Sequence, residues 1–261
     1  MAASSKNMNQ SVGKALQIIE LLVVNSEMRL LDISKAVEMP ASTALRMITA
    51  LAENGFVHQN RETLKYSLTL KFSKIGSIVG SRFSLRDAAH PVLLELSGKC
   101  KEAACIAIEV SMQVIYIDVA DGPDGMLKIT QYIGKQSPMH CTGVGKCLLL
   151  NYSENQLDDL IQAKGLQSFT PRTITGKKAL IKEIESVRAA GYAVDDQECE
   201  LGARCVAAPI RDFTGKVTAA VSVSGPINRM THEYIETISP VVVKAANDIS
   251  AALSYSEKTD A

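Results

Sequence analysis

The sequence contains no tryptophan, and only 5% of its 261 residues are aromatic. It has no apolar run of the roughly 18 residues or more that a membrane-spanning helix requires. The first ten residues are polar and lack the apolar segment of a signal peptide. These absences predict a cytoplasmic protein with no membrane partner, and in that compartment cysteines are kept as thiols.

The cysteines show no metal-binding pattern. They stand at positions 100, 105, 141, 147, 199 and 205. No two of them form a C-x-x-C pair, and the nearest histidine is the single His140 beside Cys141. Structural zinc sites usually have more closely spaced ligand pairs. We therefore expect no metal ion and no cofactor, and we expect most cysteines to be small buried side chains.

The net charge is zero, which at first argues against a nucleic-acid partner. The charges are unevenly distributed, however. Residues 1–85 carry ten Lys or Arg against six Asp or Glu (10 − 6 = +4), and the remaining residues carry 18 against 22 (18 − 22 = −4). A basic first third fits DNA contact at one end of the chain.

The first third shows three helical segments followed by a hairpin. Apolar residues from Ala15 to Val23 recur at helical spacing, and a short helix at Leu31–Val37 follows. A third helix, with Ser42 or Thr43 as its cap, runs to Gly55 and has Ala44, Leu45, Ile48 and Leu51 on its buried face. Two extended runs then flank a polar segment and predict a β-hairpin over residues 56–70. This order is that of a winged helix-turn-helix over residues 11–70, after a disordered tail over 1–10 and before a linker helix over 71–86.

The third helix and the hairpin carry the candidate DNA contacts. We expect Ser42 and Thr43 to hold a phosphate at the amino end of the helix. Arg46 lies one turn further on and could reach a guanine edge, with Met47 beside it. On the hairpin, Arg61 and Lys65 are candidate contacts to the DNA backbone. Alternatively, the serine and threonine are only helix caps and the basic residues are solvated charges.

Beyond residue 86 the pattern changes to mixed helix and strand. The predicted helices are 87–99, with Pro91 in its first turn, 153–163, 176–190 and 231–253. The predicted strands are 103–110, 114–119, 127–133, 192–194, 205–210 and 216–224. Because turns as well as helices separate these strands, we predict an α+β fold and not a doubly wound parallel sheet.

Two features of this second part suggest a ligand. The segment from Thr142 to Lys146 resembles a phosphate loop, but the required spacing is absent and Cys147 replaces the magnesium-binding Ser or Thr. It remains a glycine-rich turn whose amides could hold a small carboxylate, or a simple tight turn. Ser222 and Ser224 share one face of a strand. Two hydroxyls on an apolar sheet favour a polar ligand.

The chain resembles the IclR-type bacterial transcription regulators from about Ser11 to Leu253. The resemblance is carried by five segments in order: 40–46 (PASTALR), 66–69 (YSLT), 139–146 (MHCTGVGK), 195–209 and 222–226 (SVSGP). It implies a GAF-like α/β domain over residues 87–255 that binds a small organic acid and forms a homodimer or tetramer. By the same resemblance, Gly143 and Val144 match backbone amides that hold the ligand carboxylate. Asp195, Cys205, Ser222 and Ser224 match side chains that bind its other oxygens.

The chain departs from the family pattern at two positions. Ala41 stands where family members often have a lysine, which removes one expected phosphate contact. Gly143 stands where they often have alanine, which changes the floor of the ligand site. We predict a repressor that binds double-stranded operator DNA and responds to a small carboxylate-bearing effector.

Two alternatives to an effector-responsive regulator depend on the cysteines. One is a redox sensor that uses Cys199 and Cys205. The other is an enzyme with Cys205 or Cys141 as nucleophile, which would need a nearby base. His140 is adjacent to Cys141 but should point away from it on an extended segment, and Asp195 would raise the pKa of the Cys205 thiol. We therefore expect no catalytic residue.

Overall fold

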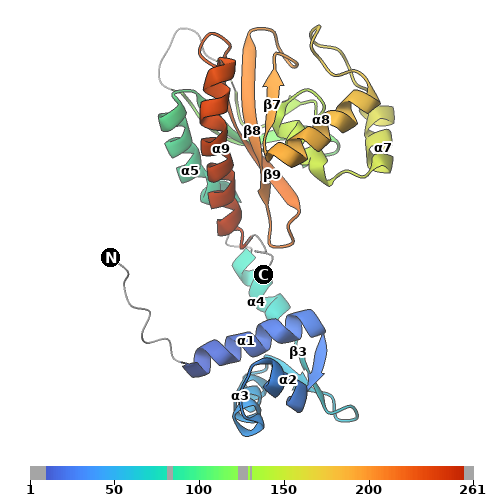
Figure 1. Ribbon diagram of the computed structural model, residues 1–261, viewed down its shortest axis with the longest axis vertical. Helices are drawn as coiled ribbons and strands as arrows, with labels where there is room; N and C mark the ends of the chain where they lie inside the picture. Colours follow the sequence, from blue (N-terminus) through green and yellow to red (C-terminus); the bar gives the residue numbers. More distant parts are fainter. Residues whose placement is uncertain (1–9, 81–84, 123–128, 130, 256–261) are drawn as a thin grey trace. The chain divides into compact units, whose positions relative to one another are not determined.

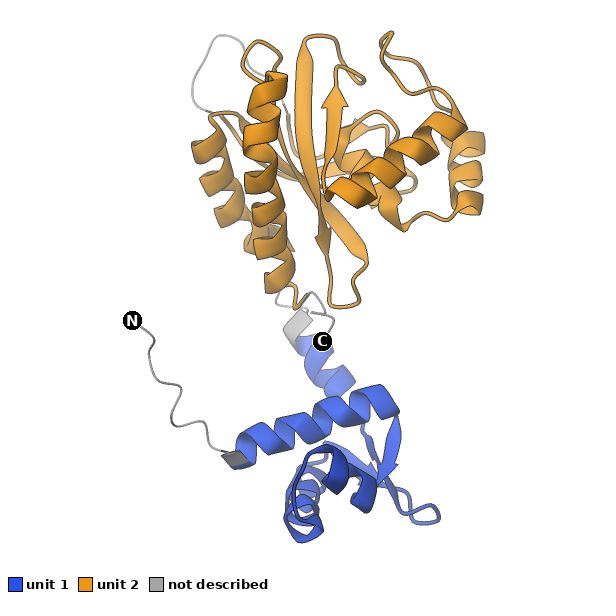
Figure 2. Ribbon diagram, viewed as in Figure 1, with its two compact units in different colours: residues 1–83 blue, residues 84–261 orange. Residues whose placement is uncertain are grey.

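The computed structural model describes residues 10–80, 85–122, 129 and 131–255. The chain divides into two compact units, residues 1–83 and 84–261 (Figure 2). No helix of the described residues is long and apolar enough to cross a membrane.

The first unit contains helices α1 (Gln10–Asn25), α2 (Leu30–Ala36), α3 (Ala41–Glu53) and α4 (Lys71–Gly80). Its strands are β1 (Glu27–Arg29), β2 (Val57–Gln59) and β3 (Lys65–Leu68), which form an antiparallel sheet in the order β1-β3-β2 (Figure 1). The core side chains are Ile18, Leu22, Ile33, Val37, Ile48, Val57 and Tyr66. The predicted three helices and hairpin are therefore present. Strand β1 was not predicted, because three residues are too few to show a period.

The start of α3 differs from the sequence prediction. Pro40 occupies the N-cap position, and its carbonyl accepts hydrogen bonds from the amides of Thr43 (2.9 Å) and Ala44 (3.0 Å). No side chain caps the helix, so the prediction that Ser42 or Thr43 does so is wrong. Proline suits a helix start because its φ is already set and its missing N–H is not needed there. Both hydroxyl residues therefore lie in the first turn of α3.

The second unit is built on a six-stranded sheet in the order β6-β5-β4-β9-β8-β7, in which every neighbouring pair is antiparallel. The strands are β4 (Ala103–Val110), β5 (Gln113–Ala120), β6 (Gln136–Ser137), β7 (Ala193–Asp196), β8 (Ala203–Arg211) and β9 (Val217–Pro226). The sheet with its helices confirms the predicted α+β fold.

The prediction of a strand at 127–133 needs correction. Residues 123–128 and 130 lie outside the described residues, and residues 129 and 131–133 form no strand. Pairing with β5 begins only at Gly134, whose amide donates to the Tyr116 carbonyl (2.8 Å). Tyr132 and Ile133 are more than half exposed, so this apolar run covers no core within the described structure. Apolar composition without a partner strand is not sufficient for a strand.

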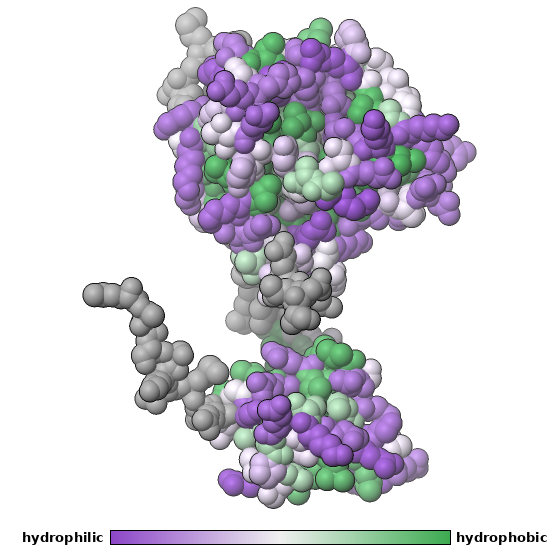
Figure 3. Space-filling view, in the orientation of Figure 1, coloured by the Kyte–Doolittle hydropathy of each residue, from purple (hydrophilic) through white to green (hydrophobic). Residues whose placement is uncertain are grey.

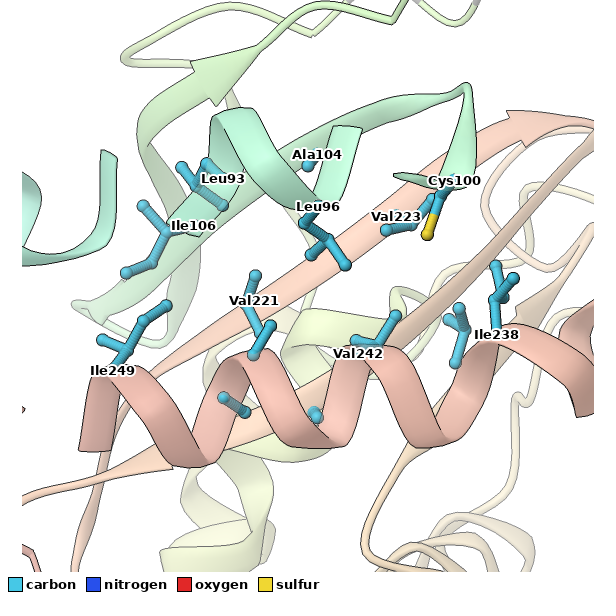
Figure 4. Close-up of a cluster of buried hydrophobic side chains, with 14 of the residues drawn as sticks. Leu93, Leu96, Cys100, Ala104, Ile106, Val221, Val223, Ile238, Val242 and Ile249 are labelled. Atoms are coloured by element: carbon cyan, nitrogen blue, oxygen red, sulfur yellow. The ribbon is translucent and has the colours of Figure 1, made fainter. Parts of the chain in front are cut away.

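Two helices cover one face of the sheet: α5 (Leu85–Cys100) and α9 (His232–Ala252). Figure 4 shows side chains of α9 and α5 pointing toward Val221 and Val223 of β9. Helix α5 begins earlier than predicted, so Pro91 lies in its second turn and not its first. There it cannot donate the helical hydrogen bond to the Asp87 carbonyl.

The other face of the sheet is covered by α6 (Gly143–Leu148), the 3-10 turn η1 (Leu149–Asn151), α7 (Glu154–Lys164) and α8 (Lys177–Ala190). The predicted helix ends are confirmed where local chemistry determines them. Ser153 forms a capping box with Gln156 at the start of α7, and Gly191 ends α8 with φ of 78°. Because strand residues alternate between faces, Ser222 and Ser224 lie on the α6 side, opposite Val221 and Val223.

Candidate functional sites

Helix α3 presents one continuous exposed stripe. Ser42 and Arg46 are exposed as predicted, and Leu45 and Thr49 are exposed beside them. These positions follow the spacing i, i+3, i+4, i+7 and therefore share one helix face. We had expected Leu45 to be buried, and it is 42% exposed. The sequence analysis missed Thr49, although its spacing from Ser42 and Arg46 places it on the same helix face.

The two other predicted residues of α3 lie on a different side of the helix. Thr43 and Met47 are half-buried, and Met47 packs against the core of the first unit. Both border a groove of about 480 Å³ that α3 shares with the apolar residues Val12 and Leu16 of α1. Figure 3 shows hydrophobic residues (green) at the surface over α1. Thr43 and Met47 are thus less accessible from solvent than Ser42 and Arg46.

The two predicted basic residues of the hairpin between β2 and β3 lie in different surroundings. Asn60 shapes the tip, since its side-chain oxygen accepts hydrogen bonds from the amides of Glu62 (2.9 Å) and Thr63 (3.1 Å). Arg61 is exposed at this tip. Lys65 pairs with Glu27 of β1 at 2.6 Å. An exposed pair of this kind contributes little to stability, so Lys65 can exchange its partner at small cost.

The glycine-rich turn of the second unit opens helix α6. Thr142 is its N-cap: the side-chain oxygen accepts from the Gly145 amide (3.2 Å) and donates to the Pro138 carbonyl (2.7 Å). The two glycines allow close packing. A Cβ atom on Gly145 would lie 2.3 Å from the Met139 carbonyl oxygen. One on Gly143 would lie 3.1 Å from the Cys205 sulfur, which places this turn directly over β8.

These two distances predict different costs for the same substitution. We expect Gly145→Ala to lower the free energy of unfolding of the second unit by about 3 kcal/mol, because a backbone atom cannot give way. Gly143→Ala meets a thiol and a methyl group that can shift slightly, and should cost about 1 kcal/mol or less. Calorimetry of the two variants measures the difference. Equal costs would mean that the turn is not packed as described.

Four predicted ligand residues lie side by side on the sheet. Asp195 of β7 is opposite Cys205 of β8, and Cys205 is opposite Ser224 of β9. Ser222 lies two residues before Ser224 on the same face of β9, and it is opposite Cys105 of β4. Asp195, Ser222 and Ser224 are all buried, and Gly143 lies over Cys205. The structure therefore brings together the residues that the sequence suggested from three separate segments.

The charges of this cluster are determined by burial. Burial raises the pKa of the Asp195 carboxyl to about 6, while hydrogen bonds from the amides of Glu198 (2.8 Å) and Cys199 (3.3 Å) favour its ionised form. Burial also raises the pKa of the Cys205 thiol to about 12, although Ser224 and Ser222 hydrogen-bond its sulfur. Cys205 is therefore a neutral thiol at pH 7, which is unsuited to nucleophilic attack.

Lys146 is a part of this site that the sequence analysis missed. It is completely buried, and its ammonium group contacts Glu183 (2.8 Å), Glu198 (2.5 Å) and the Val194 carbonyl (2.8 Å). Burial lowers the pKa of Lys146, but the two carboxylates more than offset this and raise it overall. The lysine thus fastens α6 to the turn that follows Asp195. Its signal in the sequence was a single charge in an otherwise apolar helix.

Comparison with known proteins identifies the family of the chain. Residues 78–251 match the family described as "Bacterial transcriptional regulator IclR C-terminal", and residues 11–61 match the "IclR helix-turn-helix domain". The chain is 31% identical over 247 residues to the HTH-type transcriptional regulator XynR of Escherichia coli, covering 94% of this chain and 98% of the relative. It is 30% identical over 246 residues to the transcriptional repressor IclR of Escherichia coli, covering 93% and 89%.

A solved structure supports the same assignment. The crystal structure of Thermotoga maritima IclR aligns with a TM-score of 0.63 and 31% sequence identity, covering 95% of this chain and 100% of that one. The family matches together extend over most of the chain, and both units are accounted for. The chain therefore belongs to the IclR family of DNA-binding bacterial transcription regulators.

Proposed function

We propose that this chain is a repressor whose affinity for operator DNA changes when a small carboxylate-bearing effector binds the second unit. We assign residues 11–70 to the DNA-binding domain, 71–86 to the linker and 87–255 to the effector domain. The sequence predicted one helix over the linker; α4 ends at Gly80, residues 81–84 lie outside the described residues, and α5 begins at Leu85. It acts in the cytoplasm as a homodimer or tetramer. The observation that carries the effector half is the row of Asp195, Cys205 and Ser224 under the glycine turn of α6, in which Asp195 and Ser224 are buried.

The DNA-binding half is supported by the exposed stripe of α3. Ser42 and Arg46 lie on it one turn apart, and they are our main candidates for phosphate and base contact. Thr43 and Met47 contribute from the edge of the same helix. Arg61 and Lys65 of the hairpin contact the DNA backbone in this proposal, with Lys65 exchanging Glu27 for a phosphate. The net positive charge of residues 1–85 favours this end of the chain for DNA.

The proposal of an effector site in the second unit is supported by polar groups that are buried in an apolar sheet. Ser222 and Ser224 are buried, and a buried hydroxyl or carboxyl is retained at such a cost when it serves a partner. The amides of Gly143 and Val144 hold the carboxylate of the effector in this proposal. Asp195 accepts a hydrogen bond from its hydroxyl group, which favours a hydroxy acid or a sugar acid.

The effector can act on DNA only if it binds two arrangements of the protein unequally. In a dimer, the two recognition helices read two half-sites of a pseudo-palindromic operator. We propose that effector binding changes the separation at which the two α3 helices are held. A thermal-shift screen of small carboxylates and sugar acids tests the effector half. A ligand at 100 times its Kd should stabilise the second unit by about 2.7 kcal/mol.

Two substitutions separate the proposed roles of the two units. Arg46→Ala should weaken binding to operator DNA by about 10- to 100-fold, because one base contact contributes about 1–3 kcal/mol. It should leave the thermal shift by the best acid unchanged. Asp195→Ala should reduce the thermal shift by the acid and leave DNA binding unchanged. Gel retardation and thermal shift measure the two effects.

Lys178→Ala is the matched control, since it removes an exposed helical charge from the second unit. Its DNA affinity should stay within about twofold of the parent, as expected for one remote surface charge. If Arg46→Ala and Asp195→Ala gave the same phenotype, the division of roles between the units would be wrong.

A further inference from the structure

Leu45 is an exposed leucine in the middle of helix α3. Its side chain is 42% exposed, whereas Leu51 of the same helix packs against the core of the first unit. Exposed apolar side chains that occur singly are common on protein surfaces and need no function. Leu45 differs from these in its position, because it lies on the helix face that also carries Ser42 and Arg46. Whatever contacts Ser42 and Arg46 therefore also meets Leu45.

The helical period places Leu45 and Arg46 at the two edges of the exposed stripe. At 3.6 residues per turn, consecutive residues are separated by about 100° around the helix axis. Ser42 and Thr49 therefore fall between these two side chains, and Leu45 and Arg46 extend to either side of them. All four residues are exposed. The stripe thus combines two hydroxyl groups, one guanidinium group and one branched apolar side chain.

The charges of the stripe indicate which end of α3 enters a DNA groove. Glu53 is the last residue of α3, and it is exposed on the same face, one turn beyond Thr49. DNA phosphates repel its carboxylate, whereas they attract the guanidinium group of Arg46. The amino-terminal half of the helix, which contains Leu45, is therefore the half that lies deep in the groove. This is also the half that contacts base edges in other helix-turn-helix proteins.

The chemistry of the major groove indicates what a leucine contacts there. Each base pair presents a different pattern of donors and acceptors, and the one methyl group among them is that of thymine. The side chain of Leu45 has no hydrogen-bonding atom, so covering a donor or acceptor with it would cost free energy. Contact with a thymine methyl group instead removes apolar surface of both partners from water. Leucine at this position therefore favours thymine over the other three bases.

We propose that Leu45 contacts the 5-methyl group of one thymine in each half-site of the operator, within about two base pairs of the base that Arg46 contacts. Leu45 thereby determines part of the DNA sequence that the protein binds. The proposal rests on the DNA-binding role proposed above for α3. The family assignment gives a helix-turn-helix domain, but it does not give the bases that individual side chains contact.

The experiment removes the methyl group from the DNA and the leucine from the protein. Selection from a pool of random duplexes with the full chain gives the preferred sequence, in which thymine should be enriched at a fixed position of each half-site. Replacing it by deoxyuridine, which lacks only the methyl group, should weaken binding by about fourfold per half-site, the effect expected of one buried methyl group. Leu45→Ala should bind the thymine and deoxyuridine duplexes equally. Leu94→Ala is the matched control, because it removes another exposed leucine, from α5, and should keep the preference for thymine.

Two results would overturn the proposal. If the parent protein binds the thymine and deoxyuridine duplexes equally, Leu45 contacts no methyl group. A change of oligomeric state in Leu45→Ala, measured by sedimentation, would then show that Leu45 lies between copies of the chain. If the parent and Leu45→Ala lose the same affinity when deoxyuridine replaces thymine, another residue contacts the methyl group.

Failure of the proposed function gives a different result. Arg46→Ala would then bind the selected DNA as tightly as the parent protein, and α3 would not be the helix that reads the bases. Weaker binding by Arg46→Ala, without any effect of the methyl group on the parent, would refute only the role of Leu45.

Discussion

Replacing Lys146 by methionine should lower the free energy of unfolding of the second unit by about 3–5 kcal/mol, the usual cost of removing one partner of a buried ion pair. The side chain is of similar length but carries no charge, so Glu183 and Glu198 lose their common partner. Glu198 suffers most, since burial already raises the pKa of its carboxyl to about 7. Ionising it without the lysine would cost still more, and the loss should therefore be larger at pH 8 than at pH 6.

Calorimetry of the full chain measures this effect. The transition of the second unit should fall by about 6–20 °C, because 1 kcal/mol moves a domain of this size by about 2–4 °C. The transition of the first unit should not move. The double variant Lys146→Met with Glu198→Gln should recover part of the loss, because the remaining amide needs no counter-charge. If the single variant were as stable as the parent, Lys146 would not be the counter-charge that stabilises Glu183 and Glu198.

Replacing Asp195 by asparagine should stabilise the protein at pH 8 by up to about 3 kcal/mol and have no effect near pH 4. The pKa of this carboxyl is raised by burial from 3.8 to about 6 in the folded chain. A difference of about two pKa units corresponds to about 3 kcal/mol. In the parent protein, the contribution of the neutral Asp195 carboxyl to the free energy of unfolding is fully present below about pH 4. It is lost as the pH rises to about 6. Asparagine stays neutral, and its oxygen can still accept from the amides of Glu198 and Cys199.

Asp196→Asn provides a control of opposite sign. Burial raises the pKa of the Asp196 carboxyl, but the guanidinium groups of Arg204 and Arg172 outweigh this and lower it overall. This carboxylate therefore stabilises the protein above its unfolded pKa, and its removal should destabilise at pH 8. Denaturant titrations at pH 4, 6 and 8 compare the two variants. An Asp195→Asn variant less stable than the parent at pH 8 would show that the ionised carboxylate is not the strained form.

Local chemistry made several features predictable from the sequence. Gly55, Gly191 and Ser153 end or begin helices where expected, since each acts through its own backbone or side chain. The two serines of β9 were placed on one face by the two-residue period of a strand. In contrast, Asp195 and Cys205 were identified only through the family resemblance, because their neighbours belong to other segments of the chain.

The failures share a physical cause. Leu45 was assigned to the core because it is apolar, but it is 42% exposed on α3. Lys146 was not recognised because its partners lie 37 and 52 residues further along the chain. The run at 127–133 is apolar yet pairs with nothing in the part that the structure describes. In each case the residue's role depends on a neighbour that only the folded chain supplies.

The two faces of strand β9 lie in different environments. Residues that affect ligand specificity can therefore change while residues that stabilise the fold stay the same. Val221 and Val223 pack against α5 and α9, while Ser222 and Ser224 face the α6 side. A duplicated gene can therefore exchange the side chains at 222 and 224 for others of similar size without disturbing the packing of the two helices. A lineage of such regulators could acquire responses to new acids through changes at alternate positions of one strand.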